Sequence, residues 1–195
     1  MTRLKSIFSG KLMVALGVVA LATPAAFCQS LNSNTATVAL TATLNESLTV
    51  AATPNAVTFA LVSGGTATGS APVAMTTSWI MKGSRSTVTL TGYFSSATSA
   101  LIGSASSPAS IPTSEVLGQV TTGTPTTMTA FTQSPTGSAL GVAGASLVLL
   151  TQAITGTNRA SSRTDNLNLE INLASQQQLP ADTYTGTLNL QAQAL

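Results

Sequence analysis

The sequence predicts an all-β protein: a single antiparallel, immunoglobulin-like (Greek-key) β-sandwich, preceded by a signal peptide. Three observations support this fold class. Short runs of alternating apolar and polar residues recur along the chain, as in strands with one buried face. Clusters of Gly, Pro, Ser, Asn and Thr separate these runs at the spacing of an antiparallel sandwich. No long amphipathic helical pattern interrupts them.

Residues 1–28 are expected to be the signal peptide, and residues 29–195 the β-sandwich domain. Three basic residues within the first eleven precede an apolar run at 12–21, and small residues follow this run. A membrane-spanning helix needs about 18 or more apolar residues, and this run is shorter. We therefore expect a secreted, extracellular or cell-surface protein with no membrane span after signal removal. Cleavage after Ala25 and cleavage after Cys28 both remain open.

Cys28 is the only cysteine in the sequence. One interpretation makes it a lipid-modified N-terminus, as in bacterial lipoproteins. The other removes it with the leader or leaves it as an inert thiol. In either case the mature chain has no disulfide, so its stability has to come from its core and its sheet hydrogen bonds.

The first half of the domain contains four expected strands. The first covers residues 35–44, and its pattern resumes at Leu48 and Val50 after an interruption. The next three cover 56–61, 75–81 and 86–94. The second of these contains the only tryptophan, Trp79, which we interpret as a core residue rather than a sugar-stacking one.

The second half contains two weaker candidates, at 114–120 and 127–133, and three clear strands. The run at 146–155 is the most apolar, which indicates a central strand. Residues 166–174 alternate cleanly, and the last strand follows a turn at Pro180 and covers 184–193. Surface loops are expected at 95–112 and 121–127.

The charge of the chain excludes several classes of function. Only 6% of residues are charged, against about 25% in an average soluble protein. The net charge of +2 comes from the expected signal peptide, because the sequence after residue 28 contains four basic and five acidic residues. This balance offers no basic patch for nucleic acid. With no histidine and no cysteine pair, the mature chain has no Ser-His-Asp triad, no histidine metal site and no thiolate zinc site.

Three further features have more than one interpretation. Two of the five scattered acids could in principle hydrolyse a glycoside, but such pairs arise by chance, and we predict no enzyme, no catalytic residue and no cofactor or metal. Asp165, after Arg159 and Arg163, lies in an expected polar loop that either binds a carboxylate or sugar or holds a local ion pair. Tyr93 and Tyr184 are the candidates for stacking on sugar rings.

The ends of the domain carry a resemblance to a known family. A long alternating segment, TATVALTATLNESLTVAA, opens it, Val57-Thr58-Phe59 follows, and LPADTYTGTLNL closes the chain. This arrangement resembles bacterial spore coat protein U-like domains and the pilins of archaic chaperone–usher fibres. Such pilins commonly carry a cysteine bridge that this mature chain lacks.

The resemblance implies an incomplete immunoglobulin-like sandwich, completed by a strand from the N-terminal segment of the next subunit. The donor plugs would be Val38, Leu40, Ala42 and Leu44, and the strand along the acceptor groove would carry Leu188 and Leu190. The alternative is that both terminal segments are ordinary strands of a sandwich complete within one chain.

The sequence thus predicts an exported, non-catalytic structural or adhesive cell-surface protein, such as a fibre or coat subunit assembled by strand addition. If the resemblance holds, it belongs to the bacterial envelope. The expected partners are further copies of the chain or other surface subunits. The alternative function is a secreted carbohydrate-binding, lectin-like module with a glycan ligand.

Overall fold

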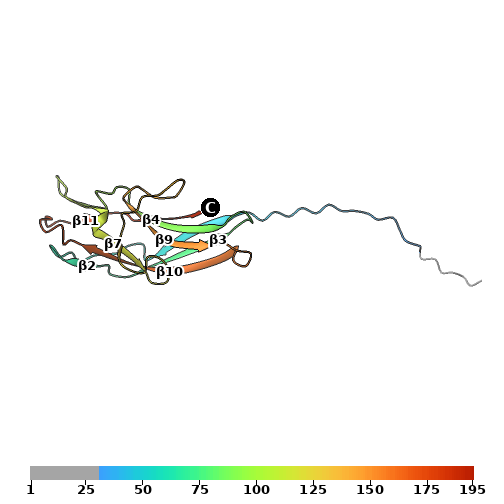
Figure 1. Ribbon diagram of the computed structural model, residues 1–195, viewed down its shortest axis with the longest axis horizontal. Helices are drawn as coiled ribbons and strands as arrows, with labels where there is room; N and C mark the ends of the chain where they lie inside the picture. Colours follow the sequence, from blue (N-terminus) through green and yellow to red (C-terminus); the bar gives the residue numbers. More distant parts are fainter. Residues whose placement is uncertain (1–30) are drawn as a thin grey trace, which may run out of the picture. The chain divides into compact units, whose positions relative to one another are not determined.

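The computed structural model describes residues 31–195, so the expected signal peptide, its cleavage site and Cys28 lie outside the described residues. The chain divides into two compact units, Met1–Ala42 and Thr43–Leu195, and the second is called the domain below. Residues 31–42, the described part of the first unit, form neither helix nor strand. The domain is all-β with antiparallel sheets, which confirms the predicted class (Figure 1). Within residues 31–195, no helix is long and apolar enough to cross a membrane.

The strands lie in three sheets. The six-stranded sheet has the order β1-β3-β10-β7-β8, and β2 also pairs with β10. The two three-stranded sheets have the orders β12-β4-β9 and β11-β5-β6. Their bounds are β1 Ser47–Thr53, β2 Thr66–Thr68, β3 Val73–Ile80, β4 Thr87–Tyr93, β5 Leu101–Gly103, β6 Ser110–Ile111, β7 Val116–Val120, β8 Thr129–Ala130, β9 Ser146–Ala153, β10 Ala160–Asn172, β11 Tyr184–Thr185 and β12 Asn189–Ala194, with a 3-10 turn at Thr113–Glu115.

Strands β3 and β10 show why a chain with so few charges forms a sheet. Buried and half-buried residues alternate along the whole of β3. On its outer face Thr76 and Thr164 share a hydroxyl hydrogen bond of 2.8 Å, and Ser78 and Ser162 share another of 2.8 Å. These cross-strand hydroxyl pairs take the place that Lys and Glu occupy in most sheets.

The core lies between the six-stranded sheet and the β12-β4-β9 sheet, in a β-sandwich-like arrangement. Both sheets contribute fully buried side chains, and Phe131, after β8, lies among them. A smaller cluster surrounds Trp79, which is only 3% exposed and donates its indole N–H to the Asn158 carbonyl at 2.8 Å. The interpretation of Trp79 as a core residue is therefore confirmed.

Several sequence expectations were wrong. Residues 35–44 form no strand, and residues 56–61 contribute only a bridge between Phe59 and Gly69. The run at 146–155 becomes β9, which is an edge strand rather than a central one. Its apolar side chains are buried by the facing sheet and the loops, which a sequence pattern does not distinguish from burial between two strands.

Two expected loops are partly strands. Residues 95–112 contain β5 and β6, and Ala100 and Ile111 of this segment are buried. The expected polar loop around Asp165 belongs to the long strand β10. Its Ser, Thr and Arg residues lie at the exposed end of that strand, so the sequence lacks the apolar alternation that marks the other half.

Candidate functional site

An apolar groove runs between two segments at the edges of the domain. One lip is formed by Ala52 and the segment 54–61 after β1, and the other by residues 182–190, which include β11 and the start of β12. The floor consists of core side chains: Val73, Phe94, Leu101, Val116, Leu169 and Ile171. The groove has a volume of about 780 Å³. Its floor is the core itself, so an occupant would extend the core.

Both lips have backbone groups free for pairing. β1, β11 and β12 each lie at the edge of their sheet and pair with a single neighbour, among the strands that the structure describes. The segment 54–61 is held on one side only, by the Phe59–Gly69 bridge and by the hydrogen bond from the Ser70 amide to the Thr58 carbonyl at 2.9 Å. Two open edges that face one apolar groove are the arrangement to which a strand can be added.

The groove is closed at one end of the domain. At this end, called the base, β1 begins, β12 ends, and Leu48 and Ala194 pack on the Trp79 cluster. The amides of Ser86 and Thr87 donate to the Leu195 carbonyl at 2.7 and 3.2 Å. Figure 1 marks the C-terminus at this end and shows β2 and β11 at the opposite end. That opposite end, where Leu61 and Asp182 line the groove, is called the mouth.

The predicted acceptor residues line this groove, and the predicted plugs are exposed. Leu188 and Leu190 both contribute to the lip formed by 182–190. Val38, Leu40 and Leu44 are 81%, 91% and 81% exposed, and Ala42 is exposed as well. Residues 31–46 are called the arm below. Its apolar side chains alternate as in a strand with one buried face, yet they are exposed to solvent.

Two residues near the mouth shape the second lip. Tyr184 is half-buried against the core and donates its hydroxyl to the Pro180 carbonyl at 2.7 Å. Gly186 lies so close to the Ala100 carbonyl that an added Cβ would be 2.0 Å from its oxygen. Only glycine allows this approach, so the chain can leave β11 and continue along the groove to Leu188. The sequence predicts a continuous strand over 184–193 and gives no signal of this contact.

Charged residues gather at the base around the root of the arm. The Glu46 carboxylate accepts from the Lys82 amide at 3.1 Å, and Lys82 Nζ and Arg85 Nε lie 3.4 and 3.2 Å from its oxygens. Hydrogen bonds lower the pKa of Glu46: the one from the Lys82 amide has the largest effect, and the one from the Arg85 side chain comes second. Arg159 donates to the Lys82 carbonyl at 3.0 Å. The start of the domain is thereby fixed to the β3–β4 connection.

Asp165 is a buried charge with a structural explanation. It is 2% exposed and accepts from Arg163 Nε at 2.7 Å, from Arg163 Nη2 at 2.9 Å and from the Thr122 hydroxyl at 2.5 Å. Burial raises its pKa, but the hydrogen bonds from Arg163 and Thr122 and the attraction of Arg163 outweigh burial and lower it. A paired, nearly inaccessible carboxylate supports the ion-pair interpretation rather than a ligand-binding loop.

The pKa of Asp165 makes stability depend on pH. Because it is lower in the folded chain than in the unfolded chain, the stabilisation is complete above the unfolded value and is lost as pH falls through the folded value. Asp165→Asn is expected to lower the free energy of unfolding at pH 7 by about 1–3 kcal/mol and to flatten its decline below pH 4. Urea unfolding from pH 7 to pH 2 measures both effects. An unchanged acid dependence would contradict the assignment.

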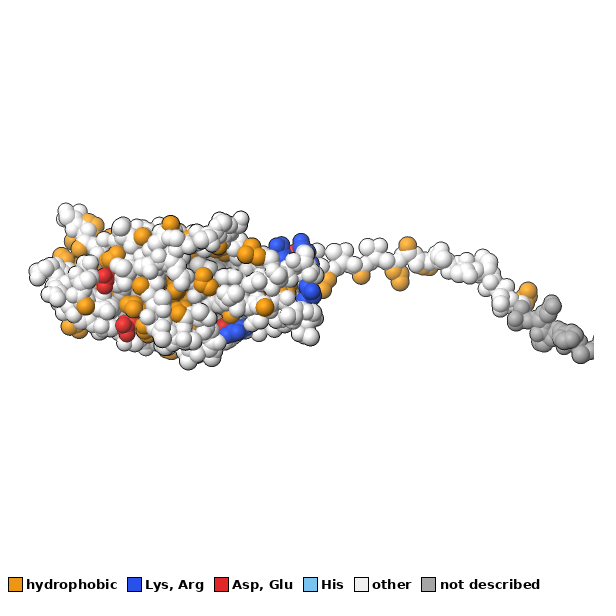
Figure 2. All heavy atoms as spheres, viewed as in Figure 1, with side chains coloured by type: hydrophobic (Ala, Val, Ile, Leu, Met, Phe, Trp, Pro, Cys, Tyr) orange, Lys and Arg blue, Asp and Glu red, His pale blue; other side chains and the backbone are white. Residues whose placement is uncertain are grey.

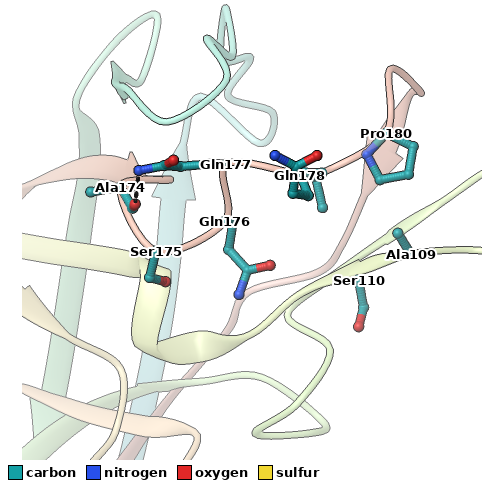
Figure 3. Close-up of a pocket in the computed structure, with 9 residues that line it drawn as sticks. Ala109, Ser110, Ala174, Ser175, Gln176, Gln177, Gln178 and Pro180 are labelled. Atoms are coloured by element: carbon teal, nitrogen blue, oxygen red, sulfur yellow. Dashed lines mark hydrogen bonds between the residues drawn. The ribbon is translucent and has the colours of Figure 1, made fainter.

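A second, more polar hollow lies on the 174–180 loop (Figure 3). It has a volume of about 400 Å³ and is lined by Ala109, Ser110 and residues 174–180, including three glutamines. No aromatic side chain contributes to it. Figure 3 shows Gln177 turned back to its own loop, where its amide donates to the Ala174 carbonyl at 3.4 Å.

The exposed aromatics do not form a sugar-stacking surface in the described part of the chain. Tyr93 donates its hydroxyl to Gln191 at 3.1 Å, while Tyr184 lies at the groove and Trp79 is buried. A glycan ligand therefore remains a prediction without a defined site. Within residues 31–195, no three His, Cys, Asp or Glu side chains lie together as candidate metal ligands. Comparison with models of known protein families, with curated proteins and with solved structures gave no match.

Proposed function

We propose that the protein is an exported, non-catalytic structural or adhesive surface subunit that assembles by strand addition. The groove of one copy binds the arm of another, and the arm supplies the missing strand of an immunoglobulin-like sandwich. The observation that carries this proposal is the coexistence of an apolar groove with two open edges and an exposed arm with the alternation of a strand. The groove lacks a strand between its two open edges, and the arm lacks an apolar surface that would bury its side chains.

The arm and the second lip match in spacing. The plugs Val38, Leu40, Ala42 and Leu44 occupy four alternate positions, as do Leu190, Leu188, Gly186 and Tyr184 of the lip. Of these lip residues, the two leucines and Tyr184 pack against the core. An antiparallel arrangement would place Leu44 beside Tyr184, Leu40 beside Leu188 and Val38 beside Leu190. Fully burying each Val or Leu plug would stabilise the complex by about 1.5–3 kcal/mol, before the cost of ordering the arm.

The direction of the arm follows from the connectivity of the chain. The arm joins its own domain at its C-terminal end, through Glu46 and β1. Because the acceptor groove is closed at the base, the donor domain has to lie at the mouth. The arm therefore runs toward the mouth, whereas the segment 184–194 runs toward the base. The added strand would be antiparallel to the last strand.

The proposal is tested with the chain from residue 29 to 195. We expect unboiled samples on a denaturing gel to give a ladder of assemblies that boiling converts to monomer, because buried, fully paired strands resist detergent more than heat. Solution mass should show the same species. Deletion of residues 29–44 should leave a folded monomer. A full-length chain that is monomeric at every concentration would contradict the proposal.

A further inference from the structure

The charges of the domain are sorted between its two ends. At the base, three basic side chains lie near one acidic side chain, counted among the described residues. The basic residues are Lys82, Arg85 and Arg159, and the acidic one is Glu46. On the face in Figure 2, basic side chains gather at one end of the domain and acidic ones toward the other. Arg163, the remaining basic residue of the domain, is bound to Asp165 within β10. This separation is notable in a chain with only 6% charged residues.

Three of the five acidic residues of the domain, Asp182, Glu115 and Glu170, lie toward the mouth. Asp182 lines the groove there, and it accepts hydrogen bonds from the Ser104 hydroxyl and from the Ala105 and Thr183 amides at 3.0 and 2.7 Å. Glu115 immediately precedes β7 and accepts from the Ser175 hydroxyl at 2.6 Å. Glu170 lies on the half-exposed outer face of β10, opposite Thr68 of β2. The Ser104 hydroxyl and Ala105 amide lower the pKa of Asp182, which keeps this group charged.

We infer that the basic base of one copy docks on the acidic mouth of the next, as a second contact beside the groove. This inference rests on the proposed function, since arm insertion brings the two ends together. With Leu44 beside Tyr184, Glu46 follows two positions later in the chain, an extended length of at most about 7 Å. That distance is shorter than the Debye length of about 10 Å at 0.1 M salt. The charges of the two ends would therefore attract each other while the arm enters.

The partner that binds the acidic mouth is a second copy of this chain, because two basic residues at the base are bound to the last residue of the arm. Glu46 is bound to Lys82 and Arg85, so insertion of the arm into a groove brings these two basic side chains to the mouth of that groove. Electrostatic attraction of this kind mainly raises the rate of association and selects orientation. It would favour head-to-tail growth and disfavour two copies meeting base to base.

The test measures assembly rate by light scattering for the chain 29–195, over salt from about 20 mM to about 500 mM. We expect the rate to fall about tenfold or more across this range, because salt screens exposed charges. The base variant Lys82→Glu/Arg159→Glu and the mouth variant Glu115→Lys/Glu170→Lys should each assemble slowly at low salt. Mixed in equal amounts, they should recover most of the wild-type rate, because each base then meets an oppositely charged mouth.

The control is Thr127→Glu, an exposed position on the β7–β8 connection, which should keep the wild-type rate and salt dependence. Assembly with no salt dependence, or variants that stay slow when mixed, would overturn the end-to-end contact and leave the proposed function standing. A wild-type chain that does not assemble, or that assembles equally without residues 29–44, would instead reject the proposed function. Far-UV circular dichroism confirms that each variant is folded.

Discussion

Leu40→Asp is expected to abolish the heat-sensitive ladder of the chain 29–195. Leu40 is 91% exposed in the arm, so the substitution removes no contact of the folded domain. In the proposed complex, the same side chain lies in the groove beside Leu188. Burial of an unpaired carboxylate there would cost several kcal/mol, and each 1.4 kcal/mol weakens binding tenfold. Solution mass and unboiled gels should show monomer only.

Thr41→Asp is the matched control for this substitution. Thr41 is the next residue in the arm, is also exposed, and would lie on the outer, solvated face of an added strand. It carries the same new charge, so the ladder should persist. Loss of assembly in both variants would show that charge on the arm, rather than burial of one face, decides the result. Persistence in both would contradict insertion of the arm.

Phe131→Ala is expected to lower the free energy of unfolding by about 3–5 kcal/mol. The ring is fully buried and meets the Phe94 ring edge to face, with centroids 5.3 Å apart. A Cβ added to Gly92 of β4 or to Gly118 of β7 would lie 3.1 or 3.0 Å from the ring, so a glycine in each sheet provides its space. Truncation would leave a cavity between the sheets that their backbones cannot fill. Urea unfolding measures the loss.

Phe59→Ala provides the comparison for Phe131. Phe59 is half-buried on the groove lip, so its truncation removes less contact and should cost clearly less than the truncation of Phe131. Gly118→Ala tests the same packing from the other side, and overpacking against the ring should cost about 1–3 kcal/mol. Equal effects for the two phenylalanines would show that Phe131 does not hold the two sheets together.

The sequence predicted the all-β class and the strands whose two faces differ clearly. Residues 86–94, where threonines alternate with mostly apolar residues, contain β4 at 87–93, and the expected run at 75–81 lies largely within β3 at 73–80. The packing of the Phe131 ring between Gly92 of β4 and Gly118 of β7 could not be predicted, because it depends on contacts between segments of different sheets. The same holds for β5 and β6, whose short strands lie in a Ser-, Gly- and Pro-rich stretch and bury Ile111 against the core.

The arm shows the limit of alternation as evidence. Residues 35–44 have a clearer strand pattern than many real strands of the domain, yet they form none. A pattern of period two reports which side chains would share a face, and it does not supply a neighbour for hydrogen bonding. For the groove, the sequence indicated Leu188 and Leu190 but not the opposite lip around Phe59, since that segment pairs at a single bridge.

Disulfide trapping between two copies tests the central claim most directly. One chain 29–195 carries Leu40→Cys, the other carries Leu188→Cys, and neither has another cysteine. Directly opposed residues of antiparallel strands have Cβ atoms about 4.5–5.5 Å apart, close enough for a disulfide after a small adjustment. Mild oxidation of the mixture should give a two-chain product that reduction removes. Absence of this product, or a crosslink that forms only within a chain carrying both substitutions, would contradict insertion of the arm into a second copy.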